Sequence, residues 1–92
     1  MKRFLRGFFD TDGSIYKLRY GIQISFKNYS HPLLKSLQKM LSGLGYKPSR
    51  ISSHSVYLTR ISDVARFFED IKPANMKHIK RFDKFIKQHM RR

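Results

Sequence analysis

Two carboxylates separated by one residue are the feature of this sequence best suited to chemistry. Asp10 and Asp12 stand in the segment Asp10-Thr11-Asp12-Gly13, in a chain with only 6 Asp and Glu residues. Hard divalent cations prefer carboxylate oxygen, so one interpretation is a cation site. The other is that both side chains merely shape a turn before Gly13, a common use of Asp and Gly. An EF-hand is excluded because its loop needs further acidic ligands, and the next acidic residue is Asp63.

The carboxylate pair follows a short helix that we expect over residues 2–10. Apolar residues recur there at helical spacing. They are Phe4, Leu5, Phe8 and Phe9. Because the C-terminal end of a helix is unfavourable for negative charge, Asp10 and Asp12 need a bonding partner at this position, either in the turn or as a bound cation.

Alternating apolar and polar residues predict four short strands, arranged as two hairpins. They are residues 14–20, 22–28, 46–51 and 55–59. Three further helices are expected, with Ser30, Ser62 and Asn75 at their starts. Pro73 ends the second of these, and the third is a basic helix over about 76–90. The order α-ββ-α-ββ-α-α, with helices on one face of an antiparallel sheet, predicts an α+β fold and one domain over residues 1–92.

The helix-free face of that sheet is predicted to be polar and cationic, without a carboxylate. By alternation it carries Gln23, Ser25, Lys27, Arg50, Ser52, Ser55, Tyr57 and Thr59. Lys17 and Arg19 are further candidates, although simple alternation would place them on the same face of the strand as the apolar Ile15. Strands with such side chains can enter the DNA major groove, where amides and Arg read base edges and Lys holds phosphates. A solvated sheet face is the alternative.

The charge balance indicates an anionic partner. The chain has 20 Lys and Arg residues and a net charge of +14, so nucleic acid is the first candidate. A membrane is not expected, because no apolar run approaches the roughly 20 residues that span a bilayer. Without a signal peptide, we expect a soluble intracellular protein, in the cytoplasm or nucleoid, or in an organelle of a eukaryote. The absence of cysteine excludes disulfides and thiolate metal sites.

The segment from Leu5 to Gly13 resembles the LAGLIDADG motif. It offers Leu, Gly, two apolar residues, Asp, a small residue, Asp and Gly in the motif's order. The similarity extends over nearly the whole chain to homing endonucleases that carry one motif per subunit. It implies the αββαββα fold with a saddle-shaped antiparallel sheet, here with an extra C-terminal helix. It also implies a homodimer that makes a staggered double-strand cut in a long pseudo-palindromic DNA site.

The same resemblance implies roles for individual residues. Asp12 would bind the catalytic Mg²⁺, for which Mn²⁺ or Ca²⁺ could substitute, while Asp10 would hold the end of the motif helix. Asn28 would be the polar residue that orients water, and the basic residue near the start of the last helix falls on His78, with Lys77 as its substitute. Lys80 would contact DNA or solvent. The two motif helices would meet through Phe4, Gly7, Phe8 and Thr11, whereas Leu5 and Phe9 would face the core.

Three other hypotheses remain open. The first is a binding-only relative, either a DNA-binding regulator or an RNA-splicing maturase, although retention of Asp12 argues against it. The second is a basic RNA-associated structural protein, which leaves the arrangement of Gly7 and Asp12 unexplained. The third is an excised or engineered half of a two-motif enzyme. An intron or intein location of the gene would establish homing.

Overall fold

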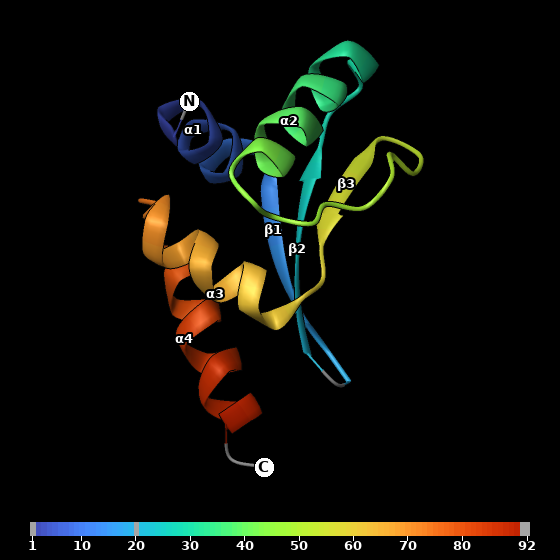
Figure 1. The fold of residues 1–92 in the computed structure, drawn as a ribbon. Helices are drawn as coiled ribbons and strands as arrows, with labels where there is room; N and C mark the ends of the chain where they lie inside the picture. The colour runs from blue at the N-terminus through green and yellow to red at the C-terminus, as the bar shows by residue number, and fades with distance from the viewer. Residues whose placement is uncertain (1, 20, 91–92) are drawn as a thin grey trace.

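The computed structural model describes residues 2–19 and 21–90 and shows, within them, four helices packed on a three-stranded antiparallel sheet (Figure 1). In chain order the elements are α1 (Lys2–Asp12), β1 (Gly13–Leu18), β2 (Gly21–Lys27), α2 (His31–Gly43), β3 (Ser55–Leu58), α3 (Ile61–Asp70) and α4 (Met76–Met90). The sheet order is β1-β2-β3. The predicted α+β class is confirmed. None of the helices in the described part of the chain is long and apolar enough to cross a membrane.

The hydrophobic core lies between the helices and the sheet, and Phe9 of α1 is near its centre. The Phe9 ring lies 5.7 Å from the Phe26 ring on β2 and 5.2 Å from the Phe67 ring on α3. Leu5 and Phe9 are both fully buried, so their predicted place in the core is confirmed. Because α1 is held through these side chains, the core fixes the position of the carboxylates at its end.

The motif helix is longer than predicted, because α1 continues to Asp12 and β1 begins at Gly13 without a loop. The Thr11 hydroxyl donates to the Gly7 carbonyl oxygen at 2.9 Å, within the last turn of the helix. A Cβ on Gly13 would lie only 2.6 Å from the Phe9 carbonyl oxygen and would also overlap the Phe9 ring. This close approach requires glycine at the junction.

The predicted strand over residues 46–51 is wrong, and the sheet has one strand fewer than expected. Ser49 does contact β3, since its N–H donates to the Tyr57 carbonyl at 2.8 Å. The Tyr57 N–H, however, donates to the Ser49 hydroxyl at 2.9 Å, where a regular strand would offer a carbonyl oxygen. Pro48 lacks a backbone N–H, which weakens strand pairing here further. The segment therefore follows β3 as an irregular loop.

Several element boundaries also differ from the predictions. The Ser30 cap of α2 is confirmed, because its hydroxyl accepts the Leu33 N–H at 3.3 Å. Ser62 is not a cap, since α3 begins at Ile61 and no side chain caps it. The first hairpin starts one residue earlier in each strand than expected. Residue 20, placed in the first strand by the prediction, lies outside the described residues.

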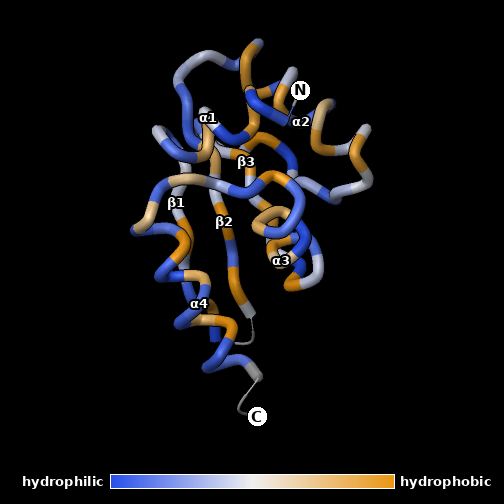
Figure 2. Tube along the Cα trace, turned by 90° about the vertical axis from the view of Figure 1, so that its left-hand side faces the viewer, coloured by the Kyte–Doolittle hydropathy of each residue, from blue (hydrophilic) through white to orange (hydrophobic). Residues whose placement is uncertain are grey.

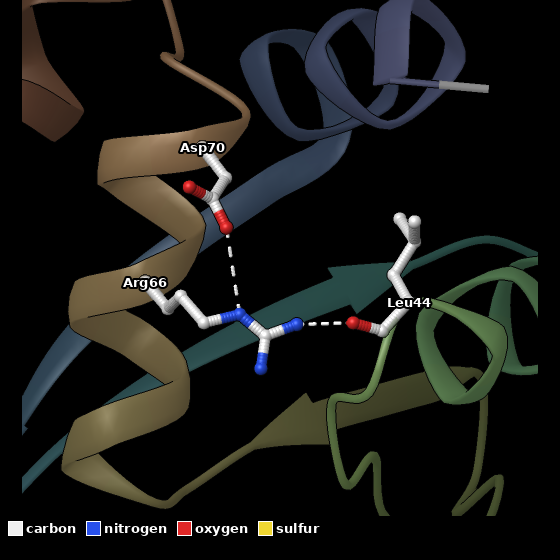
Figure 3. Close-up of polar contacts among 3 residues, drawn as sticks. All are labelled: Leu44, Arg66 and Asp70. Carbon is white, nitrogen blue, oxygen red and sulfur yellow. Dashed lines mark hydrogen bonds and ion pairs between the residues drawn. The ribbon is translucent and has the colours of Figure 1, made fainter.

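Two arginines bind carbonyl groups at helix C-termini, where positive charge is favourable. The Arg66 guanidinium donates to the Leu44 carbonyl at the end of α2 and lies 3.4 Å from the Asp70 carboxylate (Figure 3). Arg6 donates to the Ile71 carbonyl after α3 at 2.9 Å. Both cations therefore join elements of the fold.

Candidate nucleic-acid interface and carboxylate site

The two motif carboxylates have different environments, and Asp10 is a structural anchor. Its carboxylate accepts backbone N–H bonds from Ala74 at 3.1 Å and Asn75 at 3.0 Å, at the start of α4. The Asn75 amide in turn donates to the Asp10 carbonyl oxygen at 3.0 Å. Negative charge is favourable at a helix N-terminus, so Asp10 stabilises α4 although it belongs to the last turn of α1. This reciprocal clamp uses the Asp10 side chain within the fold and argues against its acting as a metal ligand.

Asp12 is exposed at the last position of α1 and lines a hollow of about 340 Å³. The other residues of this hollow are Lys27, Asn28 and Tyr29, at the end of β2 and just after it. Asp12 and Asn28, selected separately from the sequence, are thus brought together. Asn28 is fixed by two bonds, because its Oδ1 accepts the Ser30 N–H at 2.8 Å and its N–H donates to the His54 carbonyl at 2.9 Å.

The described residues supply few charged metal ligands. Among residues 2–19 and 21–90, no three His, Asp or Glu side chains are grouped closely enough to hold a metal ion. The hollow offers the carboxylate of Asp12 and the amide of Asn28, oxygen donors that suit a hard cation such as Mg²⁺. The donor set therefore fits part of a coordination shell, and further oxygen donors would have to complete it.

His78, the predicted basic residue at the start of the last helix, cannot act as a positive charge at the site. His78 is buried and its ring lies 4.6 Å from the Phe9 ring. Burial lowers the pKa of the His78 imidazole below its usual value, outweighing the nearby Asp10 charge, which acts to raise it. His78 is therefore a neutral core residue at pH 7, which argues against its predicted catalytic role. Lys77 and Lys80 are exposed.

Strand pairing defines a mainly polar sheet face on the side away from the core. Tyr16 pairs with Gln23, Ser25 pairs with Tyr57, and Lys27 pairs with Ser55. Directly opposite residues share one face of an antiparallel sheet. We call these six residues, together with Ser14 and Leu18, the outer sheet face. Five of the predicted DNA contacts lie there, namely Gln23, Ser25, Lys27, Ser55 and Tyr57.

The other predicted DNA contacts lie outside the outer sheet face. Lys17, a candidate whose face the sequence left open, pairs with Ile22 and so lies on the helix side of the sheet, where its Nζ donates to the Leu18 carbonyl at 2.7 Å. Arg50 and Ser52 are exposed in the irregular loop before β3. Thr59 is exposed just after β3, and Arg19 is exposed beyond β1.

Three exposed side chains near these surfaces were not selected from the sequence. Tyr16 is 50% exposed and Leu18 is 37% exposed on the outer sheet face, and Tyr29 is 77% exposed on the rim of the Asp12 hollow. Alternation along β1 could have identified Tyr16 and Leu18, because the apolar Ile15 faces the core and its neighbours at positions 16 and 18 must then face the other side. Aromatic and apolar groups there can contact bases or thymine methyl groups.

The residues predicted to join two subunits divide into a core residue and a surface stripe. Phe8 is buried, with its ring 5.9 Å from the Phe26 ring on β2. Phe4, Gly7 and Thr11 are exposed on one side of α1, and we call them the α1 stripe. A Cβ added to Gly7 would meet nothing within 4 Å. Packing within one subunit therefore does not explain a glycine here.

Comparison with known proteins places the chain in a protein family. A family model described as a LAGLIDADG-like domain matches residues 1–72, which include α1, the whole sheet and α3. No curated protein and no solved structure matches the chain. The clamp residue Asn75 and helix α4 lie beyond the matched region.

Proposed function

The chain belongs to the LAGLIDADG-like domain family, which is mostly made up of DNA nucleases and includes maturase-like proteins, and on this premise we propose that it is a homodimeric, Mg²⁺-dependent DNA endonuclease. Its substrate would be a long pseudo-palindromic DNA site, cut in both strands with a stagger. The observation that carries the proposal is the position of Asp12, which is exposed at the end of the α1 stripe and shares a hollow with Asn28. Association of two α1 stripes would bring two such hollows to one place on DNA.

The proposed residues have separate tasks at each strand. Asp12 would hold the cation, which when bound polarises a phosphate oxygen and lowers the pKa of water. Asn28, whose amide is already fixed by Ser30, would orient the attacking water. Lys27 in the same hollow would bind the phosphate, and Lys77 takes the place of the buried His78 as the candidate cation from the last helix. The outer sheet face would position the duplex through its base edges and phosphates.

A direct experiment uses DNA selected from a random duplex library by binding to the full chain. The selected site is placed in a supercoiled plasmid and incubated with the protein, with Mg²⁺ or with EDTA. We expect a double-strand cut within the selected site only when Mg²⁺ is present. Tight and specific binding without any cutting in Mg²⁺ or Mn²⁺ would contradict the proposed enzyme.

The dimer is tested at Gly7. We expect Gly7→Leu to dissociate the dimer on DNA, because a Leu side chain would hold two α1 helices apart. Sedimentation velocity on the selected duplex should show a dimer for the wild-type chain and a monomer for the variant. Lys35→Leu is the matched control, since it adds a Leu to an exposed position on α2 and should leave the dimer intact. A dimeric and active Gly7→Leu protein would contradict this interface.

The burial of His78 favours one alternative function. Without an exposed basic residue at that position, the chain could be a binding-only DNA regulator or an RNA-splicing maturase that keeps the fold and the charge. In that case the selected nucleic acid would be bound but not cut, and Asp12→Asn would change neither binding nor splicing. The same cleavage experiment therefore separates the two functions.

A further inference from the structure

Helix α4 carries positive charge along the whole of one side. The side chains concerned are Lys77, Lys80, Arg81, Lys84 and Lys87, all of them exposed. Their spacing of three and four residues places them on one face of the helix. We call these five residues the α4 stripe. At a rise of about 1.5 Å per residue, the stripe is about 15 Å long.

The opposite side of α4 faces the core. His78 is buried, and Phe82, Phe85 and Ile86 are half-buried against the core cluster. The Phe82 ring stacks on the Phe68 ring of α3, with the centroids 4.3 Å apart. Helices α3 and α4 lie side by side on the same face of the sheet (Figure 1). The α4 stripe therefore points away from the sheet, and the outer sheet face points the other way.

The described part of α4 holds a single carboxylate, and it does not interrupt the stripe. Asp83 instead lines a groove between α3 and α4, together with Glu69 and Lys72. Figure 2 shows hydrophilic and hydrophobic residues alternating along α4. The stripe is also held in place, because the clamp between Asp10 and Asn75 fixes the start of the helix to α1.

We propose that the α4 stripe is a second nucleic-acid contact, which binds the phosphates of a duplex without reading its sequence. Its five charges are spread over about 15 Å of the helix, a length over which one DNA strand carries about four to five phosphates at roughly 3.4 Å each. A membrane surface fits the stripe less well. A helix that binds a membrane through Lys and Arg also inserts an apolar face, and here that face is packed against the core.

Apart from Lys77, which the proposed function also uses, this contact is independent of the proposed cleavage, since it uses neither Asp12 nor the outer sheet face. The rest of the stripe lies on the other side of the molecule from the outer sheet face, so it would hold DNA outside the recognised site or a second duplex. The chain could thereby bind DNA without sequence preference before it reaches a target. Helix α4 is outside the region that matches the family model, so the contact is a feature of this chain and not one that the match implies.

The test is the salt dependence of binding to a labelled duplex of arbitrary sequence. The stripe variant of the full chain combines Arg81→Gln, Lys84→Gln and Lys87→Gln. Its control combines Lys35→Gln, Lys39→Gln and Lys47→Gln, three exposed positions outside α4. Gln has nearly the helix propensity of Lys and Arg, so circular dichroism should show both variants folded. If each lost phosphate contact lowers the slope of log K against log salt by about 0.9, the stripe variant should lose about 2 to 3 units of slope.

The control variant is expected to lose less than about one unit of slope, because it removes the same charge without removing a contact. Equal slope losses in the two variants would overturn the proposal and assign the effect to net charge alone. Binding to vesicles rich in phosphatidylserine provides a second arm. A stripe variant that loses vesicle binding but keeps its duplex binding would also overturn it.

Discussion

Asp12→Asn is expected to reduce DNA cleavage about a thousandfold and to leave DNA binding nearly unchanged. Asn keeps the shape of the side chain but removes the charge that would hold the cation, and metal assistance to phosphate hydrolysis is worth several kcal/mol. Asp12 is exposed, and no hydrogen bond of its side chain holds the fold together in the described structure. Cleavage is measured in single turnover with the selected plasmid, and binding by equilibrium titration of the same site.

Asp83→Asn is the matched control, since it removes one negative charge from an exposed residue on α4 that lines neither the Asp12 hollow nor the α1 stripe. It should cut at nearly the wild-type rate. The comparison separates the ligand role of Asp12 from a general change in net charge. Wild-type cleavage by Asp12→Asn would show that Asp12 does not hold the cation.

Gly13→Ala is expected to destabilise the fold by about 3 kcal/mol, at the upper end of the cost of overpacking a core. The added Cβ would lie 2.6 Å from the Phe9 carbonyl oxygen and would overlap the Phe9 ring, which is fully buried. Neither group can move without disturbing the core or the end of α1. A small domain has a stability of about 5 to 15 kcal/mol, so the loss should be large in a urea unfolding curve.

Gly7→Ala provides the contrast for this measurement. Its new Cβ meets nothing within 4 Å, and Ala is favoured over Gly in a helix by about 1 kcal/mol. At protein concentrations where the chain is monomeric, Gly7→Ala should therefore unfold at higher urea concentration than the wild type. Equal destabilisation by the two substitutions would show that the junction at Gly13 is not the cause.

Local sequence patterns predicted the helices and strands whose structure depends mainly on residues close together in the sequence. The apolar spacing in α1 correctly placed Leu5 and Phe9 in the core, and the Ser30 cap correctly placed the start of α2. Residues 46–51 have a strand-like pattern as well, but their contact with β3 depends on which group of Ser49 meets the Tyr57 N–H. The Tyr57 N–H donates to the Ser49 hydroxyl and not to a backbone carbonyl oxygen. The alternation of apolar residues cannot predict which of these two groups accepts the hydrogen bond.

The site was harder to predict because its contacts join distant parts of the chain. Asp10 binds residues more than 60 positions away, so its role as an anchor for α4 could not be derived from its own neighbourhood. The spacing that selected His78 gave its distance along the last helix but not the direction of its side chain. That direction depends on how α4 packs, and here it places His78 against Phe9.

Mixed dimers test the proposed function most directly. Wild-type and Asp12→Asn chains are coexpressed with different tags, and the mixed dimer is isolated by two successive affinity steps on the selected duplex. With Mg²⁺, wild-type dimers should linearise the supercoiled plasmid, and dimers of the variant should leave it intact. Mixed dimers should stop at the nicked circle, because each Asp12 would serve one strand. Linearisation by mixed dimers at the wild-type rate would contradict a dimer in which the two Asp12 residues each cut one strand.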